Sequence, residues 1–224
     1  MPNALDRLFE NMDRWRHLPS YQLERRVDVF FSVFMKDVVE AHVGVALKPV
    51  IVPEFPLRHG SLDPNLDTRT DTRARDTRNR SSKVDYLLVS QDLASAFFVE
   101  LKTDMRSRDP KQDAHMRTAQ RLGLRRVLKG VCTLAECSTE AGKYRALLGE
   151  LAALGLVESE STSRFRLSGA DPTLSIVYVQ PVRSGVSELV IDFAEFATRI
   201  ESSGDEIGRI FATHLRRWMT EPGA

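Results

Sequence analysis

The chain has 224 residues, of which 42% are hydrophobic and 28% charged, so it is long enough to bury a core as one domain with or without appendages. Its 12 glycines, 10 prolines and 8% aromatic residues exclude collagen-like, low-complexity and mostly disordered chains. Lysine and arginine together number 32, against 31 for aspartate and glutamate, so no global basic field indicates a nucleic-acid partner. Local basic patches remain compatible with this balance.

Two cysteines, Cys132 and Cys137, are too few for a disulfide scaffold, and no cysteine or histidine neighbours them at the spacing of a zinc site. We interpret them as small apolar residues in a reducing compartment. No apolar run is long enough to span a membrane, and the first residues carry no apolar signal core. The sequence therefore predicts a cytoplasmic protein without a membrane partner.

The first part of the chain predicts two helices and an edge strand. Apolar residues at helical spacing over residues 5–15 predict a short helix that ends before Pro19. Ser20 is placed to cap a second helix with a wide apolar stripe, and Gly44 marks its end. The apolar segment that follows, residues 46–55, contains prolines and therefore predicts an irregular or edge strand.

Residues 59–82 differ from the rest in composition. They contain three copies of Asp-Thr-Arg and almost no apolar residue, so we expect a mobile loop. Its arginines are candidates for contacts with nucleic-acid phosphates, above all Arg73, Arg75, Arg78 and Arg80. Interleaved aspartates nearly cancel this charge, and that pattern is more typical of a solvated loop.

The remaining chain predicts a hairpin, helices, a strand and a terminal helix. Residues 84–89 and 96–102 are strand-like, and Pro110 after Asp109 begins a helical region that continues with interruptions to residue 156. A strand at 174–182, a short strand near 189–191 and one helix over 193–218 close the chain. We therefore expect a helical appendage at 1–19, a core at 20–192 and a C-terminal helix within 193–224 packed on the core.

The hairpin carries three polar side chains in an apolar setting. Side chains alternate along a strand, so Glu100 and Lys102 share one face. A turn centred between residues 92 and 93 places Asp85 directly opposite Glu100. Like charges at such a position are destabilising unless one is protonated or a cation lies between them. Mg²⁺ requires hard oxygen ligands at about 2.0–2.1 Å, so the pair predicts a divalent metal site.

Asp85, followed by Glu100-Leu101-Lys102 at the end of an apolar strand, resembles the PD-(D/E)XK nuclease superfamily. The (D/E)XK element is complete, and Val84-Asp85 stands where the family has Pro-Asp. The element order of residues 20–182 is similar to the family's αβββαβ core. The resemblance implies an α/β, restriction-endonuclease-like fold with a mixed central sheet flanked by helices. It also implies Mg²⁺-dependent phosphodiester hydrolysis of DNA.

The resemblance assigns roles to the hairpin residues. Asp85 and Glu100 would ligate Mg²⁺, for which Mn²⁺ would substitute, and the backbone carbonyl of Leu101 would be a further ligand. Lys102 would orient or deprotonate the attacking water, or stabilise the developing charge. These are the expected catalytic and metal-binding residues.

Three further residues become candidates through the same resemblance. Glu24 matches a position where many members carry a glutamate on the first helix, and Glu54 lies on the strand before the loop; both are candidate metal ligands. Gln112 is similar to a glutamine that one branch of the family uses, and it would orient Lys102 or the water on the metal. That branch usually has a tyrosine four residues later, where this chain has Met116.

Other interpretations stay open at this point. Glu100 and Lys102 also fit a salt bridge on one strand face, and Asp85 fits a capping acid. The chain would then be a plain α/β interaction module, or a nuclease-fold protein that binds nucleic acid or protein without cleaving. The five histidines show no ligand spacing, so we interpret them as structural or surface residues. DNA is the expected partner, and whether the chain forms a homodimer is left open.

Overall fold

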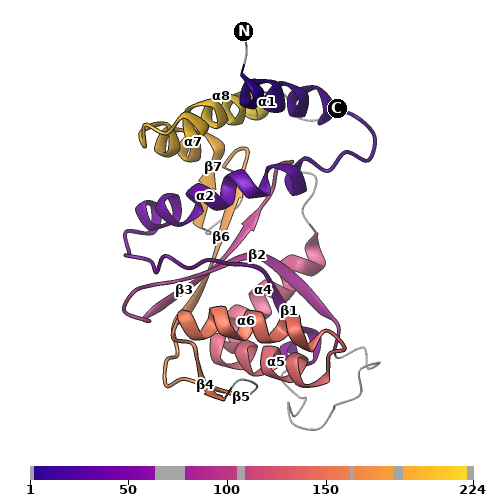
Figure 1. Ribbon diagram of the computed structural model, residues 1–224, viewed down its shortest axis with the longest axis vertical. Coiled ribbons are helices and arrows are strands. Elements are labelled where there is room, and N and C mark those ends of the chain that lie inside the picture. The colour runs from indigo at the N-terminus through magenta and orange to yellow at the C-terminus, as the bar shows by residue number, and fades with distance from the viewer. Residues whose placement is uncertain (1–2, 64–78, 105–108, 162–163, 184–188, 221–224) are drawn as a thin grey trace. The chain divides into compact units, whose positions relative to one another are not determined.

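The computed structural model describes residues 3–63, 79–104, 109–161, 164–183 and 189–220 (Figure 1). It is a mixed α/β protein whose five-stranded sheet has the order β1-β2-β3-β6-β7 and is flanked by helices. This confirms the predicted α/β class with a mixed central sheet. Within the described part of the chain, no helix combines the length and the apolar character that crossing a bilayer requires.

The sheet begins with an antiparallel meander. The edge strand β1 (Val52–Arg58) pairs with β2 (Ser81–Val89), and β2 pairs with β3 (Ser95–Leu101). At the other end, β6 (Thr173–Gln180) and β7 (Leu189–Asp192) are parallel. The predicted edge strand is confirmed, because β1 lies at one end of the order, where prolines cost the fewest ladder hydrogen bonds.

The chain divides into two compact units, which we name by their contents. The hairpin unit comprises Ala46–Glu100 and Asp109–Ile176, and the terminal unit comprises Met1–Val45, Leu101–Arg108 and Val177–Ala224. Strands β3 and β6 each contribute residues to both units.

The hairpin unit combines β1, β2 and β3 with four helices and a small second sheet. Its helices are α3 (His59–Leu62), α4 (Pro110–Leu122), α5 (Leu124–Cys137) and α6 (Ala141–Ala153). Helix α4 begins as predicted, with Pro110 in its first turn and the Asp109 side chain accepting the Lys111 N–H at 2.9 Å. The second sheet, β4 (Val157–Ser161) with β5 (Arg164–Leu167), was not predicted, because Val157 is its one buried residue and no apolar run marks it.

The expected loop at 59–82 is shorter in the structure than its composition suggests. Residues 59–62 form α3, and Ser81 and Ser82 already belong to β2, so the expectation is wrong at both ends. The backbone N–H of His59 donates to the Arg80 carbonyl at 2.9 Å, which joins the start of α3 to the residue before β2. Residues 64–78 lie outside the described residues.

The terminal unit contains α1 (Ala4–Trp15) and α2 (Leu23–Val43), both close to their predicted positions. Asn3 and Asp6 form a reciprocal capping box at the start of α1, and Gly44 ends α2 in a left-handed conformation with φ 70°. The expectation that Ser20 caps α2 is wrong. Gln22 precedes the first helical residue, and Ser20 has a left-handed φ of 64° in the connecting turn.

The expected single C-terminal helix is two helices, α7 (Phe193–Glu201) and α8 (Glu206–Thr220). The chain turns at Gly204, whose φ is 74°, and the Asp205 side chain accepts the Gly208 N–H at 3.0 Å at the start of α8. The apolar pattern continues across this turn, so periodicity alone did not reveal the break.

Aromatic residues form the core of the terminal unit. The Phe31 ring on α2 lies 4.9 Å from Phe196 on α7 and 5.0 Å from Phe211 on α8, both edge-on. Helix α1 joins this core through Asp13, whose carboxylate accepts the Trp218 indole N–H at 2.6 Å. Helices α1 and α8 are therefore hydrogen-bonded to each other within the terminal unit.

Candidate active site

The turn between β2 and β3 sets the register of the two strands. The Ser90 N–H donates to the Ser95 carbonyl at 2.9 Å, and the Asp92 carboxylate accepts the Ala94 N–H at 3.0 Å. Leu93 takes up the left-handed position of the turn with φ 62°. The observed pairs run from Val89 opposite Ala96 to Tyr86 opposite Val99, which is the register expected from the sequence.

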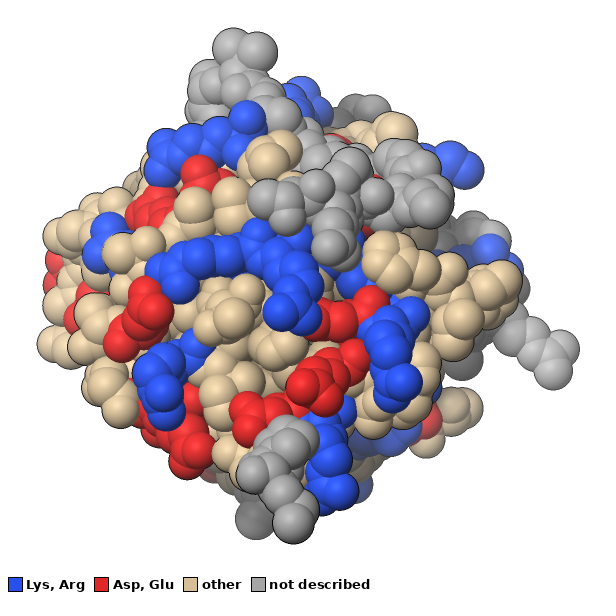
Figure 2. Space-filling view, turned by 90° about the horizontal axis from the view of Figure 1, so that it is seen from above, with Lys and Arg blue, Asp and Glu red and all other residues tan. Residues whose placement is uncertain are grey.

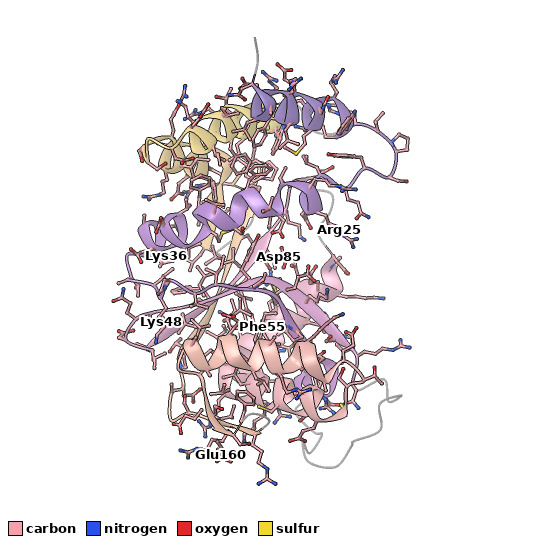
Figure 3. All side chains as sticks on the ribbon, viewed as in Figure 1. Arg25, Lys36, Lys48, Phe55, Asp85 and Glu160 are labelled. Atoms are coloured by element: carbon pink, nitrogen blue, oxygen red, sulfur yellow. The ribbon has the colours of Figure 1, made fainter. Side chains whose placement is uncertain are left out.

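The observed pairing ends at Tyr86 and Val99, and continuing the same register by one residue would bring Asp85 opposite Glu100. Both residues lie within their strands, and directly opposed side chains have Cβ atoms about 4.5–5.5 Å apart. Glu100 has 0% solvent exposure, whereas Asp85, labelled on β2 in Figure 3, is half-buried. Two carboxyl groups therefore lie one residue beyond the last paired positions of the hairpin, with Glu100 fully buried and Asp85 half-buried.

The surroundings of these acids are apolar. The adjacent pair along β2 and β3 is Tyr86 with Val99, and the pair after it, Leu87 with Phe98, points to the same sheet face as the acids and is fully buried. Burying a carboxylate is costly unless a hydrogen-bonded cation or a metal ion compensates it, or unless the group is protonated. A divalent cation between the two carboxyl groups would offset the repulsion between their charges.

Lys102 follows Glu100 by two residues and belongs to the terminal unit. Its side chain is 6% exposed, and its Nζ lies 3.9 Å from a carboxylate oxygen of Glu24 on α2. The Lys102 N–H donates to the Val179 carbonyl at 2.8 Å, so its backbone is held against β6. The sequence-predicted residues Glu24 and Lys102 are therefore neighbours.

Glu24 sits in a partly desolvated position. Burial raises the pKa of Glu24 above its ordinary value, and the positive charge of Lys102 and a hydrogen bond with the Thr103 backbone offset part of that effect. Because the net direction is upward, its ionised form is disfavoured in the folded chain. A further cation nearby would stabilise the ionised form of Glu24.

The other two candidates have partners elsewhere. Glu54 is exposed, has a left-handed φ of 50°, and forms an ion pair with Lys83 on β2. Gln112 on α4 donates from its amide to the Lys83 carbonyl at 2.8 Å, so it supports the first half of β2. The structure brings both residues to Lys83, and neither contact indicates metal binding.

Among the loop arginines, only Arg80 falls within the described residues, where it is exposed. Arg73, Arg75 and Arg78 lie outside them. Within the described part, no three His, Cys, Asp or Glu side chains group closely enough to hold a metal ion. A metal at the hairpin would therefore have two carboxylates, with backbone oxygen and water completing its shell, as Mg²⁺ commonly does.

Sequence reasoning missed two features that the fold assembles. A cavity beside Glu24 brings together Arg16, Tyr21 and Arg25 with Thr103. The signal that might have indicated it is the Arg25-Arg26 pair directly after Glu24.

The second feature is a histidine pair in the hairpin unit. The rings of His59 and His115 have centroids 4.7 Å apart, and the Nδ1 atom of His115 is hydrogen-bonded to the Ser82 hydroxyl at 3.0 Å. No sequence signal pairs these residues, because they lie far apart in the chain on α3 and α4.

In comparisons with known proteins, no family model matches the chain, and no curated protein or solved structure matches it significantly.

Proposed function

We propose that this protein is a Mg²⁺-dependent nuclease of the PD-(D/E)XK type that hydrolyses phosphodiester bonds of DNA, on a restriction-endonuclease-like fold. The observation that carries the proposal is the hairpin register, which ends at Tyr86 opposite Val99 and, continued by one residue, would bring Asp85 opposite the fully buried Glu100. A pair of opposed carboxyl groups in an apolar sheet is destabilising by itself and favourable around a divalent cation. The order α2, β1, β2, β3, α4, β6 supports the fold, with α3 inserted between β1 and β2 and with α5, α6, β4 and β5 inserted before β6.

Each residue has a role in this proposal. Asp85 and Glu100 hold the ion, with the neighbouring Leu101 carbonyl as a further oxygen ligand, and Mn²⁺ substitutes for Mg²⁺. When bound, the ion neutralises phosphate charge and makes a water molecule more acidic. Lys102 holds a positive charge at the end of β3 that orients the water or stabilises charge on the phosphate. Glu24 keeps Lys102 in place through their 3.9 Å contact.

A cleavage assay tests the proposal. Supercoiled plasmid and a labelled single strand are incubated with the protein in Mg²⁺, in Mn²⁺ and in EDTA. We expect cleavage in either metal and none in EDTA. Asp85→Asn and Glu100→Gln should abolish cleavage, whereas the matched control Glu150→Gln, an exposed carboxylate on α6, should cleave like the wild type.

The alternative outcomes separate the rival functions. A protein that binds DNA but cleaves no DNA or RNA in either metal would be a nuclease-fold binding module. Cleavage that persists in Asp85→Asn and Glu100→Gln at the wild-type rate would refute the site.

A further inference from the structure

A cavity of about 410 Å³ opens beside Glu24 within the terminal unit. The turn between α1 and α2 supplies Arg16, Tyr21 and Gln22, α2 supplies Arg25, and Thr103 and Asp104 complete the wall. A second hollow of about 330 Å³ shares Tyr21, Gln22 and Arg25 with it and adds Ser20 and Arg26. The two form one recess around the start of α2, which we call the α2 recess.

Its charge is mainly basic. Arg25 and Arg26 are exposed, and the positive charge of Arg25 also acts on the neighbouring Glu24 carboxylate, where it helps to lower the pKa. Arg16 is half-buried in the same wall, and the acids that face the recess are Glu24 and Asp104. On the face shown in Figure 2, acidic and basic side chains are otherwise interspersed. Exposed guanidinium groups are the groups that bind phosphate oxygens.

The recess also offers aromatic surface. Tyr21 lines both hollows, and its ring centroid lies 6.1 Å from that of Trp15 at the end of α1, at an interplanar angle of 59°. Trp15 is 41% exposed, so part of its large apolar side chain is open to solvent. Proteins that bind single-stranded nucleic acid commonly combine aromatic side chains with arginines, because every base can stack on an aromatic ring.

The position of the recess connects it to the proposed chemistry. Glu24 lines the recess and also lies 3.9 Å from Lys102, the lysine that acts on water or phosphate in the proposed function. A strand held by Arg25 and Arg26 would therefore pass near Lys102. Duplex DNA keeps its bases stacked on one another, so it cannot use an aromatic wall in this way.

We propose that the α2 recess binds an unpaired segment of the DNA substrate, with Arg16, Arg25 and Arg26 on its phosphates and Tyr21 stacked on a base. This inference rests on the proposed nuclease function for its substrate class. It assigns the enzyme a preference for single strands, or for duplexes with an unpaired end, over blunt duplexes.

Binding measured without metal tests the inference separately from catalysis. A short fluorescein-labelled single-stranded oligonucleotide is titrated with the full chain in EDTA, and fluorescence anisotropy gives Kd at several salt concentrations. Arg25→Ala/Arg26→Ala is compared with Arg7→Ala/Arg209→Ala. The control pair removes the same charge from exposed helix positions in the same unit.

We expect Arg25→Ala/Arg26→Ala to raise Kd at least about tenfold at low salt. The slope of log K against log salt should also fall by about 1.4, since each phosphate contact to a single strand contributes about 0.7. The control pair should stay within about twofold of the wild type. Tyr21→Ala should weaken binding by about 5-fold to 100-fold without changing the slope, and Tyr21→Phe should restore it.

The readouts distinguish failure of the inference from failure of the nuclease proposal. Binding that depends on Arg25, Arg26 and Tyr21 in a protein that never cleaves would support the recess and remove the nuclease function. The wild type and the Arg25→Ala/Arg26→Ala variant could instead both cleave, with the variant binding like the control. This result would overturn the proposed role of the α2 recess and leave the nuclease proposal standing. No single-strand binding, or equally tight binding of a blunt duplex, would also overturn it.

Discussion

The Glu100 carboxyl group has 0% exposure, and continuing the observed register by one residue would bring the Asp85 carboxyl group opposite it. Neutral apolar residues fill the rest of the β2–β3 pairing, from Tyr86 opposite Val99 to Val89 opposite Ala96. An acid at such a position lowers stability unless its charge is used. This cost is the physical reason to assign function to the pair.

Replacing Asp85 tests that cost. Asp85→Asn removes one of two opposed negative charges, worth about 0.2–1 kcal/mol, so the metal-free protein should melt about 1–3 °C higher than the wild type. Mg²⁺ or Mn²⁺ should raise the melting temperature of the wild type by binding the native state, and should leave that of Asp85→Asn unchanged. Differential scanning fluorimetry measures both effects. A metal-induced shift of wild-type size in Asp85→Asn would contradict a shared site.

Replacing Lys102 tests its catalytic role. Lys102→Ala should lower the single-turnover cleavage rate by a factor on the order of 100 or more, while metal affinity measured by calorimetry stays close to that of the wild type. The reason is that, in the proposed mechanism, Lys102 acts on charge that develops in the transition state rather than on the ion. Lys102→Met keeps the buried stem and should show the same loss, which separates charge from packing. An unimpaired rate in both variants would remove Lys102 from the mechanism.

His59 gives a pH-dependent prediction. Burial lowers the pKa of His59, and the nearby His115 and Arg80 lower it further. Above the unfolded pKa of 6.5, His59 is neutral in both the folded and the unfolded chain, and the protein keeps its full stability. As pH falls below 6.5 towards the folded pKa, the unfolded chain takes up a proton more readily than the folded chain, so stability is lost. Urea unfolding between pH 8 and pH 5 should show a smaller loss for His59→Gln than for the wild type. The exposed His17→Gln should follow the wild type, and an equal loss in His59→Gln would rule His59 out.

Among the elements, α5 approaches α3 most closely at Gly130. A Cβ atom on Gly130 would lie 2.1 Å from the Ser61 hydroxyl oxygen and 2.9 Å from the Ser61 Cβ, both on α3. Ser61 is 1% exposed, so it has little room to move. The helix therefore needs glycine at this contact for space, although its backbone is ordinary.

Gly130→Ala should lower the free energy of unfolding by about 1–3 kcal/mol, because a methyl group forced into a packed contact displaces its neighbours. Gly149→Ala on α6 is the matched control, since a Cβ there meets nothing within 4 Å. It should raise stability by up to about 1 kcal/mol through helix propensity. Urea denaturation of both variants checks this pair, and a neutral Gly130→Ala would contradict the close packing.

The same elements show what the sequence can predict. Helix α1 was predicted close to its observed bounds from apolar spacing, and the start of α4 from Asp109 and Pro110, because these signals are local. The β2–β3 register was predictable for the same reason, since a short turn fixes it. The β4–β5 pair was missed because its strands expose most side chains. The break between α7 and α8 was missed because apolar spacing continues through it.

For the candidate site, the sequence predicted the hairpin acids and Lys102 but not their surroundings. Alternation along β3 and the turn length are enough to set Asp85 against Glu100. The α2 recess joins the α1–α2 turn to Thr103 and Asp104, and only the tertiary fold brings segments so distant in the chain together. Glu54 and Gln112 were chosen by position, and their partner in the structure is Lys83.

At the scale of the whole molecule, a net charge of +1 gives no long-range attraction for DNA. In the proposed function, DNA binding would then depend on local groups. The hairpin unit carries the paired acids, whereas the terminal unit carries Lys102, Glu24 and the α2 recess. The nuclease proposal therefore depends on a cation at the acids more than on any other single feature.

A crystal structure with Mn²⁺ tests that dependence most directly. We predict an anomalous Mn²⁺ peak about 2.0–2.2 Å from one carboxylate oxygen of Asp85 and one of Glu100, and its loss in crystals of Asp85→Asn. Ordered Asp85 and Glu100 side chains without a peak at saturating Mn²⁺, or a peak that both variants hold at another position, would contradict the metal site and with it the proposed function.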